Sequence, residues 1–365
     1  MTEKTANGAD AAHPESERLP GVPGVARMRF PWAFVVFAGM GLVTVWLISG
    51  RQLDFGVLAR AHPLPLTAAL GVALVAICLD AMRLQILVRL DRKSVPFLQA
   101  VRAVLVYGFF SAITPTSLGG EVSMVWLLNR RGLTPGAAAA VTGIRTILPL
   151  AAFFLAMPIF ALASPAQFRG FLKTAVPVGA VLSVVLALVI IAALVGKGAL
   201  QRRARQAVAR NESPSHWHVI GRTLAWVDKA ARECWNLISS AFRERPLVLA
   251  AATLVTVVHA FAYLSIVPLC ARAFGFGPPF WGTVAGAAIV EIVIVFIPLP
   301  GGSGGAEFGI GAVLTASAPD ARGAAVLWAV VLWRIIATHI RVLAGGVLTA
   351  RIMHRAQKYG LEHAA

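Results

Sequence analysis

The stretch AVPVGAVLSVVLALVIIAALV at residues 175–195 contains no charged side chain. About 20 consecutive apolar residues cross the roughly 30 Å hydrocarbon core of a bilayer as an α-helix, so this stretch alone is long enough to span a membrane. Similar uncharged runs occupy residues 32–49, 66–77 and 247–270. The sequence therefore predicts an all-α, polytopic integral membrane protein.

The composition of the whole chain favours the same class. Hydrophobic residues make up 58% of the chain and charged residues 13%, whereas a soluble domain carries about 25% charged residues. The cysteines, Cys78, Cys234 and Cys270, lie far apart and have neither metal-site nor disulfide spacing. We predict no metal and no cofactor.

The net charge of +17 comes from Lys and Arg in the segments between apolar runs. Basic clusters lie at 89–93, 196–245 and 351–358. Because short basic loops of membrane proteins face the cytoplasm, we expect all three clusters and the N-terminus on that side. No nucleic-acid recognition motif accompanies the charge, so nucleic acid is not predicted as a partner.

The apolar runs predict about eight to ten helices in two halves. Residues 30–352 form the predicted transmembrane domain, with halves at 30–195 and 246–352 joined by the basic loop 196–245. Within this loop, Leu224–Phe242 predicts an amphipathic helix at the membrane interface. Residues 1–29 and 353–365 are predicted to be a disordered cytoplasmic N-terminus and a cytoplasmic tail. The predicted spans are 31–49, 65–88, 96–113, 136–163, 174–195, 247–272, 281–297 and 322–350, with broken regions at 114–131 and 298–312.

Two segments interrupt the apolar sequence with the same pattern of residues. They read TPTSLGGE at 114–121 and PLPGGSGGAE at 298–307. Proline removes a backbone donor and glycine tolerates unusual dihedrals, so each segment predicts a broken or re-entrant helix. Matching broken segments in two halves point to the binding site of a transporter. The alternative is an ordinary surface loop in which Glu121 and Glu307 are first-turn helix charges.

An arginine follows each broken segment within apolar sequence, at Arg145 and Arg334. A charge at the centre of a span costs roughly 2.5–3.5 kcal/mol, so each arginine requires a partner or a wet cavity. We predict the pairs Glu121–Arg145 and Glu307–Arg334. These pairs either pin the broken helices or line a polar cavity for an anionic lipid headgroup.

Other polar residues also lie within apolar sequence. Asp80 and Arg83 are three residues apart and are expected to neutralise each other. Arg341 follows Arg334 by seven residues, which can place both on one helix face. The predicted translocation site comprises Pro115, Gly119, Gly120, Glu121, Arg145, Glu291, Pro300, Gly301, Gly302, Gly304, Glu307 and Arg334.

The residues of the two broken segments carry a family resemblance. PTSLGGEVSMVWLLNRRG at 115–132 resembles the GGE…LL…RRG signature of the flippase-like membrane domain of lysylphosphatidylglycerol synthases. PLPGGSGGAEFG at 298–309 is similar to the P-x-P-G-G-x-G-x-x-E motif of the same family. Family members often have an arginine where this chain has Met124.

The resemblance implies a polytopic bacterial inner-membrane protein that takes part in lipid translocation. It implies as substrate an anionic, aminoacylated, polyprenyl-linked or hopanoid lipid. The aminoacyl-transferase domain of the full synthases has no counterpart in this sequence, so aminoacyl transfer is not predicted.

Three classes of function remain open from the sequence. The first is a carrier that translocates a membrane lipid without ATP, since the chain has no Walker A motif. The second is an intramembrane lipid-modifying transferase, although no H-E-x-x-H or G-x-S-x-G motif is present. The third is a non-catalytic partner subunit of a lipid- or envelope-synthesis enzyme, with the basic loop as its docking surface. The oligomeric state is left open.

Overall fold

The computed structural model describes residues 54–114, 117–163, 215–294 and 300–358, and every regular element in these ranges is a helix. Among the described residues, four helices are long and apolar enough to cross a membrane, namely Pro63–Asp91, Pro135–Phe153, Pro246–Ala273 and Gly323–Ile352. These helices confirm the prediction of an all-α polytopic membrane protein. The predicted spans at 31–49 and 174–195 lie outside the described residues.

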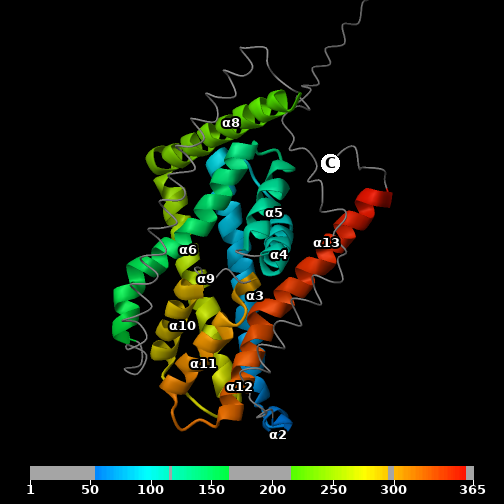
Figure 1. The fold of residues 1–365 in the computed structure, drawn as a ribbon. Helices are drawn as coiled ribbons and strands as arrows, with labels where there is room; N and C mark the ends of the chain where they lie inside the picture. The colour runs from blue at the N-terminus through cyan, green and yellow to red at the C-terminus, as the bar shows by residue number, and fades with distance from the viewer. Residues whose placement is uncertain (1–53, 115–116, 164–214, 295–299, 359–365) are drawn as a thin grey trace, which may run out of the picture.

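The first half consists of a long helix, two short helices and a second long helix. These are α3 (Pro63–Val88), α4 (Phe97–Ile113), α5 (Leu118–Asn129) and α6 (Pro135–Ala163). The short helices α4 and α5 fold back against each other. Both are shorter than the roughly 20 residues that a bilayer crossing requires, so together they form a hairpin that returns to the end where it began (Figure 1).

The second half repeats this order. It contains α9 (Pro246–Ala273), α10 (Phe280–Ile294), α11 (Gly305–Ser317) and α12 (Gly323–Arg334). A π-helical turn, η6 (Ile335–His339), then continues α12 into α13 (Ile340–Lys358). Helix therefore resumes inside both regions that were predicted as broken, at Leu118 and at Gly305.

The two halves run in opposite directions. In Figure 1, α3 rises from the lower end to the upper end, whereas α9 descends from the upper end beside it. The last helix of each half also packs against a short helix of the other half: α6 contacts α10, and α13 contacts α4. The described helices of the two halves thus follow the same order in opposite directions, which is the arrangement of an inverted repeat in secondary transporters. The bounds predicted for the halves, 30–195 and 246–352, stay a prediction.

One end of the bundle is covered by α8 (Ser215–Glu244), which lies across the other helices (Figure 1). The predicted helix Leu224–Phe242 falls within it. The Glu233 carboxylate accepts a hydrogen bond of 3.2 Å from the Gly136 amide at the start of α6, and the Trp235 side chain is 70% exposed. The short helix η3 (Arg89–Asp91) and the end of α13 lie at this same end, so the described parts of the three basic clusters gather there.

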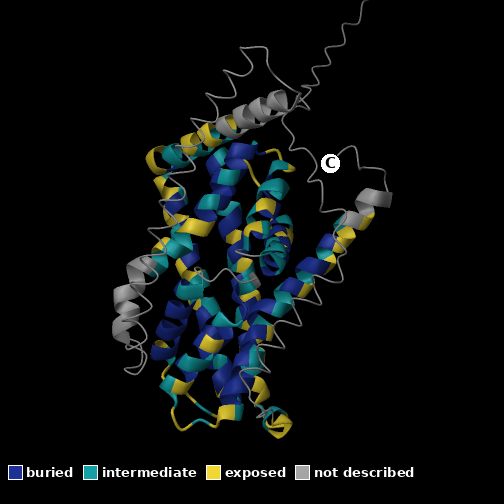
Figure 2. Cartoon of the chain, viewed as in Figure 1, coloured by how far each residue is buried: buried dark blue, intermediate teal, exposed yellow. Residues whose placement is uncertain are grey.

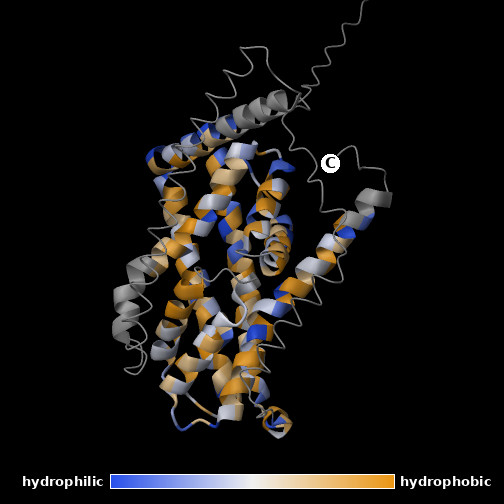
Figure 3. Cartoon of the chain, viewed as in Figure 1, coloured by the Kyte–Doolittle hydropathy of each residue, from blue (hydrophilic) through white to orange (hydrophobic). Residues whose placement is uncertain are grey.

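Three apolar clusters form the core of the part of the chain that the structure describes. The first joins α3 with α9, α10, α11 and α12, and the second joins α3 with α4, α5, α6, α8 and the start of α9. The third is small and joins α4 to α13. Large apolar side chains such as Leu74, Leu254 and Val257 are nevertheless exposed on the long helices. Figure 2 shows exposed positions along these helices, and Figure 3 shows that the helices are mostly hydrophobic. An exposed apolar belt around buried polar groups is the arrangement that a lipid environment favours. A short helix, α2 (Phe55–Ala59), lies at the end opposite α8 (Figure 1).

Candidate functional site

The turn of the first hairpin depends on close packing between α4 and α5. A Cβ atom on Gly120 would lie 1.9 Å from the Ser111 hydroxyl and 3.0 Å from the Tyr107 carbonyl oxygen, so a larger residue does not fit without movement. The Gly119 amide donates a 3.0 Å hydrogen bond to the Thr114 hydroxyl. These two glycines therefore position Glu121 in the first turn of α5. The predicted site residue Pro115 lies outside the described residues.

The turn of the second hairpin is built from glycines with left-handed backbone. Pro300 opens the short helix η5 (Pro300–Gly302), and Gly301, Gly302 and Gly304 have φ values of 59°, 65° and 88°. Side chains other than glycine rarely adopt such φ values. The Glu307 carboxylate accepts a 2.7 Å hydrogen bond from the Gly304 amide, so it caps the N-terminus of α11.

The predicted pair of Glu307 with Arg334 is confirmed. Arg334 Nε lies 2.8 Å from Glu307 Oε1, and both side chains are buried. This is a charge contact rather than an aligned hydrogen bond, because Oε1 has no hydrogen-bond donor in the described residues. Arg334 also donates a 2.6 Å hydrogen bond from Nη2 to the Gly301 carbonyl oxygen. Through these two contacts, Arg334 holds the end of α12 against the turn η5 and the start of α11.

The predicted pair of Glu121 with Arg145 is wrong. Arg145 Nη2 lies 2.6 Å from Asp80 Oδ2 on α3, and Asp80 Oδ1 lies 2.5 Å from Arg83 Nη2. The prediction failed because α3 packs against α6 and brings a buried carboxylate to Arg145 from 65 residues away. The expected contact between Asp80 and Arg83 is present, but Asp80 is shared between two guanidinium groups.

Glu121 is instead held by hydroxyl groups. Its Oε1 atom accepts hydrogen bonds from the Tyr107 hydroxyl at 2.9 Å and from the Thr146 hydroxyl at 2.8 Å. The Arg145 guanidinium lies 4.2 Å from the centroid of the Tyr107 ring, a cation–π contact. Tyr107 therefore stands between Glu121 and Arg145 and touches both.

Glu291 belongs to a second polar group, on α10. The Tyr263 side chain on α9 and the guanidinium groups of Arg334 and Arg341 lie near this carboxylate. The turn η5 packs against α4 of the other half. The two hairpins thus bring most of the predicted site residues to the middle of the bundle, where the halves meet, and their role in binding a substrate stays a prediction.

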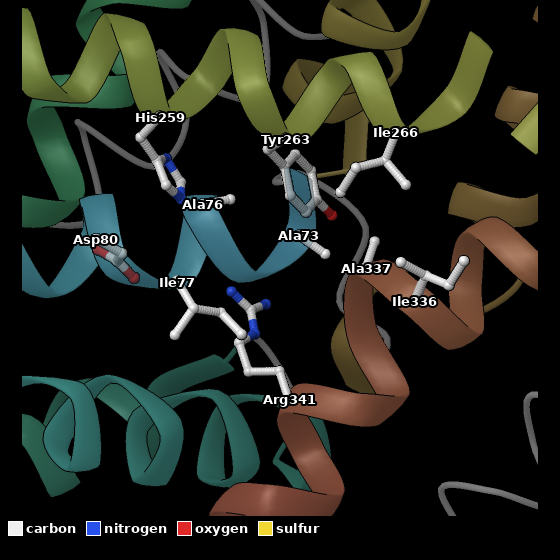
Figure 4. Close-up of a pocket in the computed structure, with 10 residues that line it drawn as sticks. All are labelled: Ala73, Ala76, Ile77, Asp80, His259, Tyr263, Ile266, Ile336, Ala337 and Arg341. Atoms are coloured by element: carbon white, nitrogen blue, oxygen red, sulfur yellow. The ribbon is translucent and has the colours of Figure 1, made fainter. Parts of the chain in front are cut away.

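A small pocket lies where the two long helices α3 and α9 pass the π turn (Figure 4). It has room for about one water molecule. In Figure 4 the Arg341 side chain reaches from α13 toward α3. The lining residues are Ala73, Ala76, Ile77, Asp80, His259, Tyr263, Ile266, Ile336, Ala337 and Arg341.

Arg341 does not share a helix face with Arg334, contrary to the expectation from their spacing. The π turn between them contains about one residue more than an α-helical turn. This extra residue offsets the direction of Arg341 by about 100° from that expected in a regular α-helix. Arg334 consequently contacts the second hairpin, while Arg341 lines the pocket. Sequence reasoning missed Tyr107, whose hydroxyl donates to Glu121, and Tyr263, which lies near Glu291. A tyrosine hydroxyl in an apolar run is the signal that could have identified them.

Comparison with known proteins agrees with this architecture. The model of the family described as the lysylphosphatidylglycerol synthase TM region matches residues 26–345. The chain belongs to this family. A UPF0104 membrane protein from Archaeoglobus fulgidus is 25% identical over 309 residues, which cover 83% of this chain and 91% of that protein. Membership in the lysylphosphatidylglycerol synthase TM-region family and the four long apolar helices establish a multi-pass membrane protein.

Proposed function

We propose that this protein translocates a membrane lipid between leaflets, as a carrier without ATP hydrolysis. The observation that carries the proposal is the inverted repeat whose two hairpin turns meet around buried arginines and carboxylates. Broken helices that face a polar centre at the interface of two inverted halves are typical of transporter binding sites. Each ionisable side chain is costly within a membrane, and Glu121, unlike Glu307, fastens no hairpin through an ion pair. Its presence therefore supports a role in transport.

The described conformation is closed to a headgroup, since the central pocket has room for about one water molecule. A carrier therefore requires a second conformation, and an inverted repeat supplies one when its halves exchange their local structures. In such an exchange, Arg145 leaves Asp80 and pairs with Glu121, as Arg334 pairs with Glu307 in the described state. Arg145 already contacts the Tyr107 ring, and the Tyr107 hydroxyl donates a hydrogen bond to Glu121. The guanidinium group therefore has only a short distance to move from Asp80 to Glu121.

The end that carries α8 is the cytoplasmic end in this proposal. Its basic clusters follow the distribution of Lys and Arg that orients membrane proteins. In a bacterial cell the protein would then lie in the inner membrane with α8 at the cytoplasmic headgroup level. The exposed Trp235 ring supports this placement, because indole rings favour the interface.

The test is a lipid-sidedness assay in proteoliposomes. Fluorescent phosphatidylglycerol, lysyl-phosphatidylglycerol and a polyprenyl-phosphate sugar are incorporated, and a membrane-impermeant quencher reports the outer leaflet with time. We expect faster exchange of one of these lipids than in protein-free vesicles, and a loss of this gain in Glu121→Gln. Asp320→Asn, in the exposed loop before α12, is the matched control and should exchange lipid as the wild type does. No exchange of any lipid above the protein-free rate would reject the carrier.

The competing proposal is a partner subunit of a lipid-synthesis enzyme, docked through α8. The exposed Trp235 and Phe242 side chains, seven residues apart on one helix face, are the observation that favours it. Under that proposal, replacing both side chains by serine abolishes function in cells, while Glu121→Gln leaves function intact. The carrier predicts the opposite ranking of the two variants.

A further inference from the structure

The last helix of each half passes from one apolar cluster of the core to another. In the first half, Val141 and Ile144 on α6 are buried in the second cluster, whereas Phe153 further along α6 packs against the first. In the second half, Trp333 on α12 is buried in the first cluster, and α13 continues to α4, where Val342 belongs to the third. Each last helix therefore starts beside its own hairpin and ends against a short helix of the other half.

The regular α-helix is interrupted at both of these passages. Pro149 lies between the two parts of α6 and has no N–H group, so the carbonyl oxygen of Arg145, four residues earlier, receives no α-helical hydrogen bond. In the second half, the π turn η6 begins directly after Arg334, and its last backbone hydrogen bond joins residues that are five positions apart. Both interruptions thus begin at the buried arginine that follows each hairpin.

Interior prolines and π turns are common causes of sharp bends in helices. Figure 1 shows that α6 changes direction along its length. In Figure 4, the segment that carries Ile336 and Ala337 and the segment that carries Arg341 run in different directions. The two interruptions therefore coincide with bends in the described conformation.

The helices α3 and α9, both wholly within the described ranges, continue past this level without an interruption. Each contributes buried residues to the first and the second cluster, and the two helices pack along each other. Pro268 is an interior proline of α9, but Val267 and Cys270 on its two sides belong to the same cluster. The pair of α3 and α9 therefore forms a continuous spine beside the two interrupted helices.

We propose that Pro149 and the π turn are a matched pair of hinges between two blocks that move on this spine. The upper block, at the end that carries α8, comprises α4, α5, the part of α6 before Pro149, and α13. The lower block comprises α10, α11, α12 and the part of α6 after Pro149. A hinge needs only a few residues that absorb the change in backbone angles. Because each hinge lies where its helix changes block, bending there preserves the packing inside both blocks.

The hinges lie at the level of the closed central pocket, since Ile336 and Ala337 of the π turn line it. Movement of one block against the spine opens this centre toward one end of the bundle. The purpose of the hinges rests on the proposed function, because a carrier requires a second conformation. Their motion is measurable without any substrate.

The test measures distances between two spin labels on the full-length protein in lipid nanodiscs, by pulsed electron–electron double resonance. The three native cysteines are first replaced by alanine. Labels are then attached in pairs through Val122→Cys on α5, Ala151→Cys near the end of α6, Phe308→Cys on α11 and Val347→Cys on α13. All four positions are exposed.

The blocks predict which pairs keep a fixed distance. The pair at Val122 and Val347 lies in the upper block and the pair at Ala151 and Phe308 in the lower block, so each should give one narrow distance. The pairs Val122 with Ala151 and Phe308 with Val347 span a hinge and should give two distances or a broad distribution. Halves that move as rigid bodies predict the reverse, because these last two pairs each lie within one half. That reverse pattern, or the same behaviour in all four pairs, would overturn the inference.

The variant Pro149→Ala tests one hinge directly. It restores the missing N–H donor in α6, so the distribution between labels at Val122 and Ala151 should narrow to a single distance. Pro63→Ala is the matched control at the exposed first residue of α3, where proline displaces no helical hydrogen bond, and should leave the distribution broad. An unchanged distribution in folded Pro149→Ala would contradict the hinge, and if this variant does not fold, the four label pairs decide alone.

These outcomes separate the hinges from the proposed function. Movement across both hinges without any lipid exchange in vesicles keeps the hinges and rejects the carrier. Lipid exchange by a protein in which all four label pairs give one narrow distance keeps the carrier and rejects the hinges.

Discussion

The two hairpins share one sequence pattern but hold their glutamates in different ways. Glu307 is 1% exposed and contacts a backbone amide and a guanidinium group, so it can move only when α11 and α12 separate. Glu121 is partly exposed and accepts hydrogen bonds from two hydroxyl groups. In the first half the charge that neutralises the arginine comes from Asp80, on a neighbouring helix. Glu307 therefore fastens its hairpin, whereas Glu121 is able to change partners.

The largest effect on stability is expected for Asp80→Asn. This change leaves Arg83 and Arg145 buried without their carboxylate, and breaking one buried ion pair already costs about 3–5 kcal/mol. We expect the protein to lose most of its folded yield in detergent, measured by fluorescence-detected size exclusion. Asp320→Asn should keep the wild-type yield. A wild-type yield for Asp80→Asn would show that water or another group serves the two arginines.

A somewhat smaller loss is expected for Glu307→Gln. The amide oxygen can still accept from Gly304, but Arg334 loses its charge partner, and a cost of about 3 kcal/mol follows. The unfolding midpoint in a thermal scan should fall clearly. The double variant Glu307→Gln with Arg334→Leu should recover part of that loss, because no unpaired charge then remains. If the double variant is less stable than the single one, the pair does not fasten the hairpin in the way described.

The hairpin turns can also be compared through their glycines. Gly120→Ala forces a Cβ atom against Ser111 and the Tyr107 carbonyl oxygen, and overpacking of this kind costs about 1–3 kcal/mol. Gly71→Ala on α3 is the control, since a Cβ atom there meets nothing within 4 Å. It should stabilise the protein by about 0.5–1 kcal/mol. Thermal unfolding of the two variants side by side should therefore show shifts of opposite sign.

The smallest effect on stability is expected for Glu121→Gln. The amide oxygen can still accept from Tyr107 and Thr146, so we expect a loss of less than about 1 kcal/mol. The lipid-exchange rate in vesicles should nevertheless fall, because an amide cannot attract Arg145 during the proposed exchange. A large loss of stability together with normal exchange would mean that Glu121 is a fastening residue like Glu307.

Much of the fold could be predicted because a bilayer requires long uncharged runs, and these are visible in the sequence. The pair of Glu307 with Arg334 was predictable for a similar reason, since both residues belong to one hairpin and the helix that follows it. The partner of Arg145 was not predictable, because Asp80 reaches it only through the packing of α3 against α6. The inverted direction of the halves likewise depends on how helices cross, and the residue pattern of the motifs is the same for either direction.

The π turn at Ile335–His339 has a consequence for how this chain tolerates changes in length. Substitutions within the turn alter side chains one at a time, whereas deletion of a single residue would convert the turn to regular α-helix and rotate everything beyond it by about 100°. Arg341 would then leave the pocket, and Gly345 would no longer face the Leu105 carbonyl oxygen, from which a Cβ atom on Gly345 would lie only 2.0 Å. Among natural variants of this protein, insertions and deletions should therefore be scarcer in these five residues than in the loops at either end of the bundle.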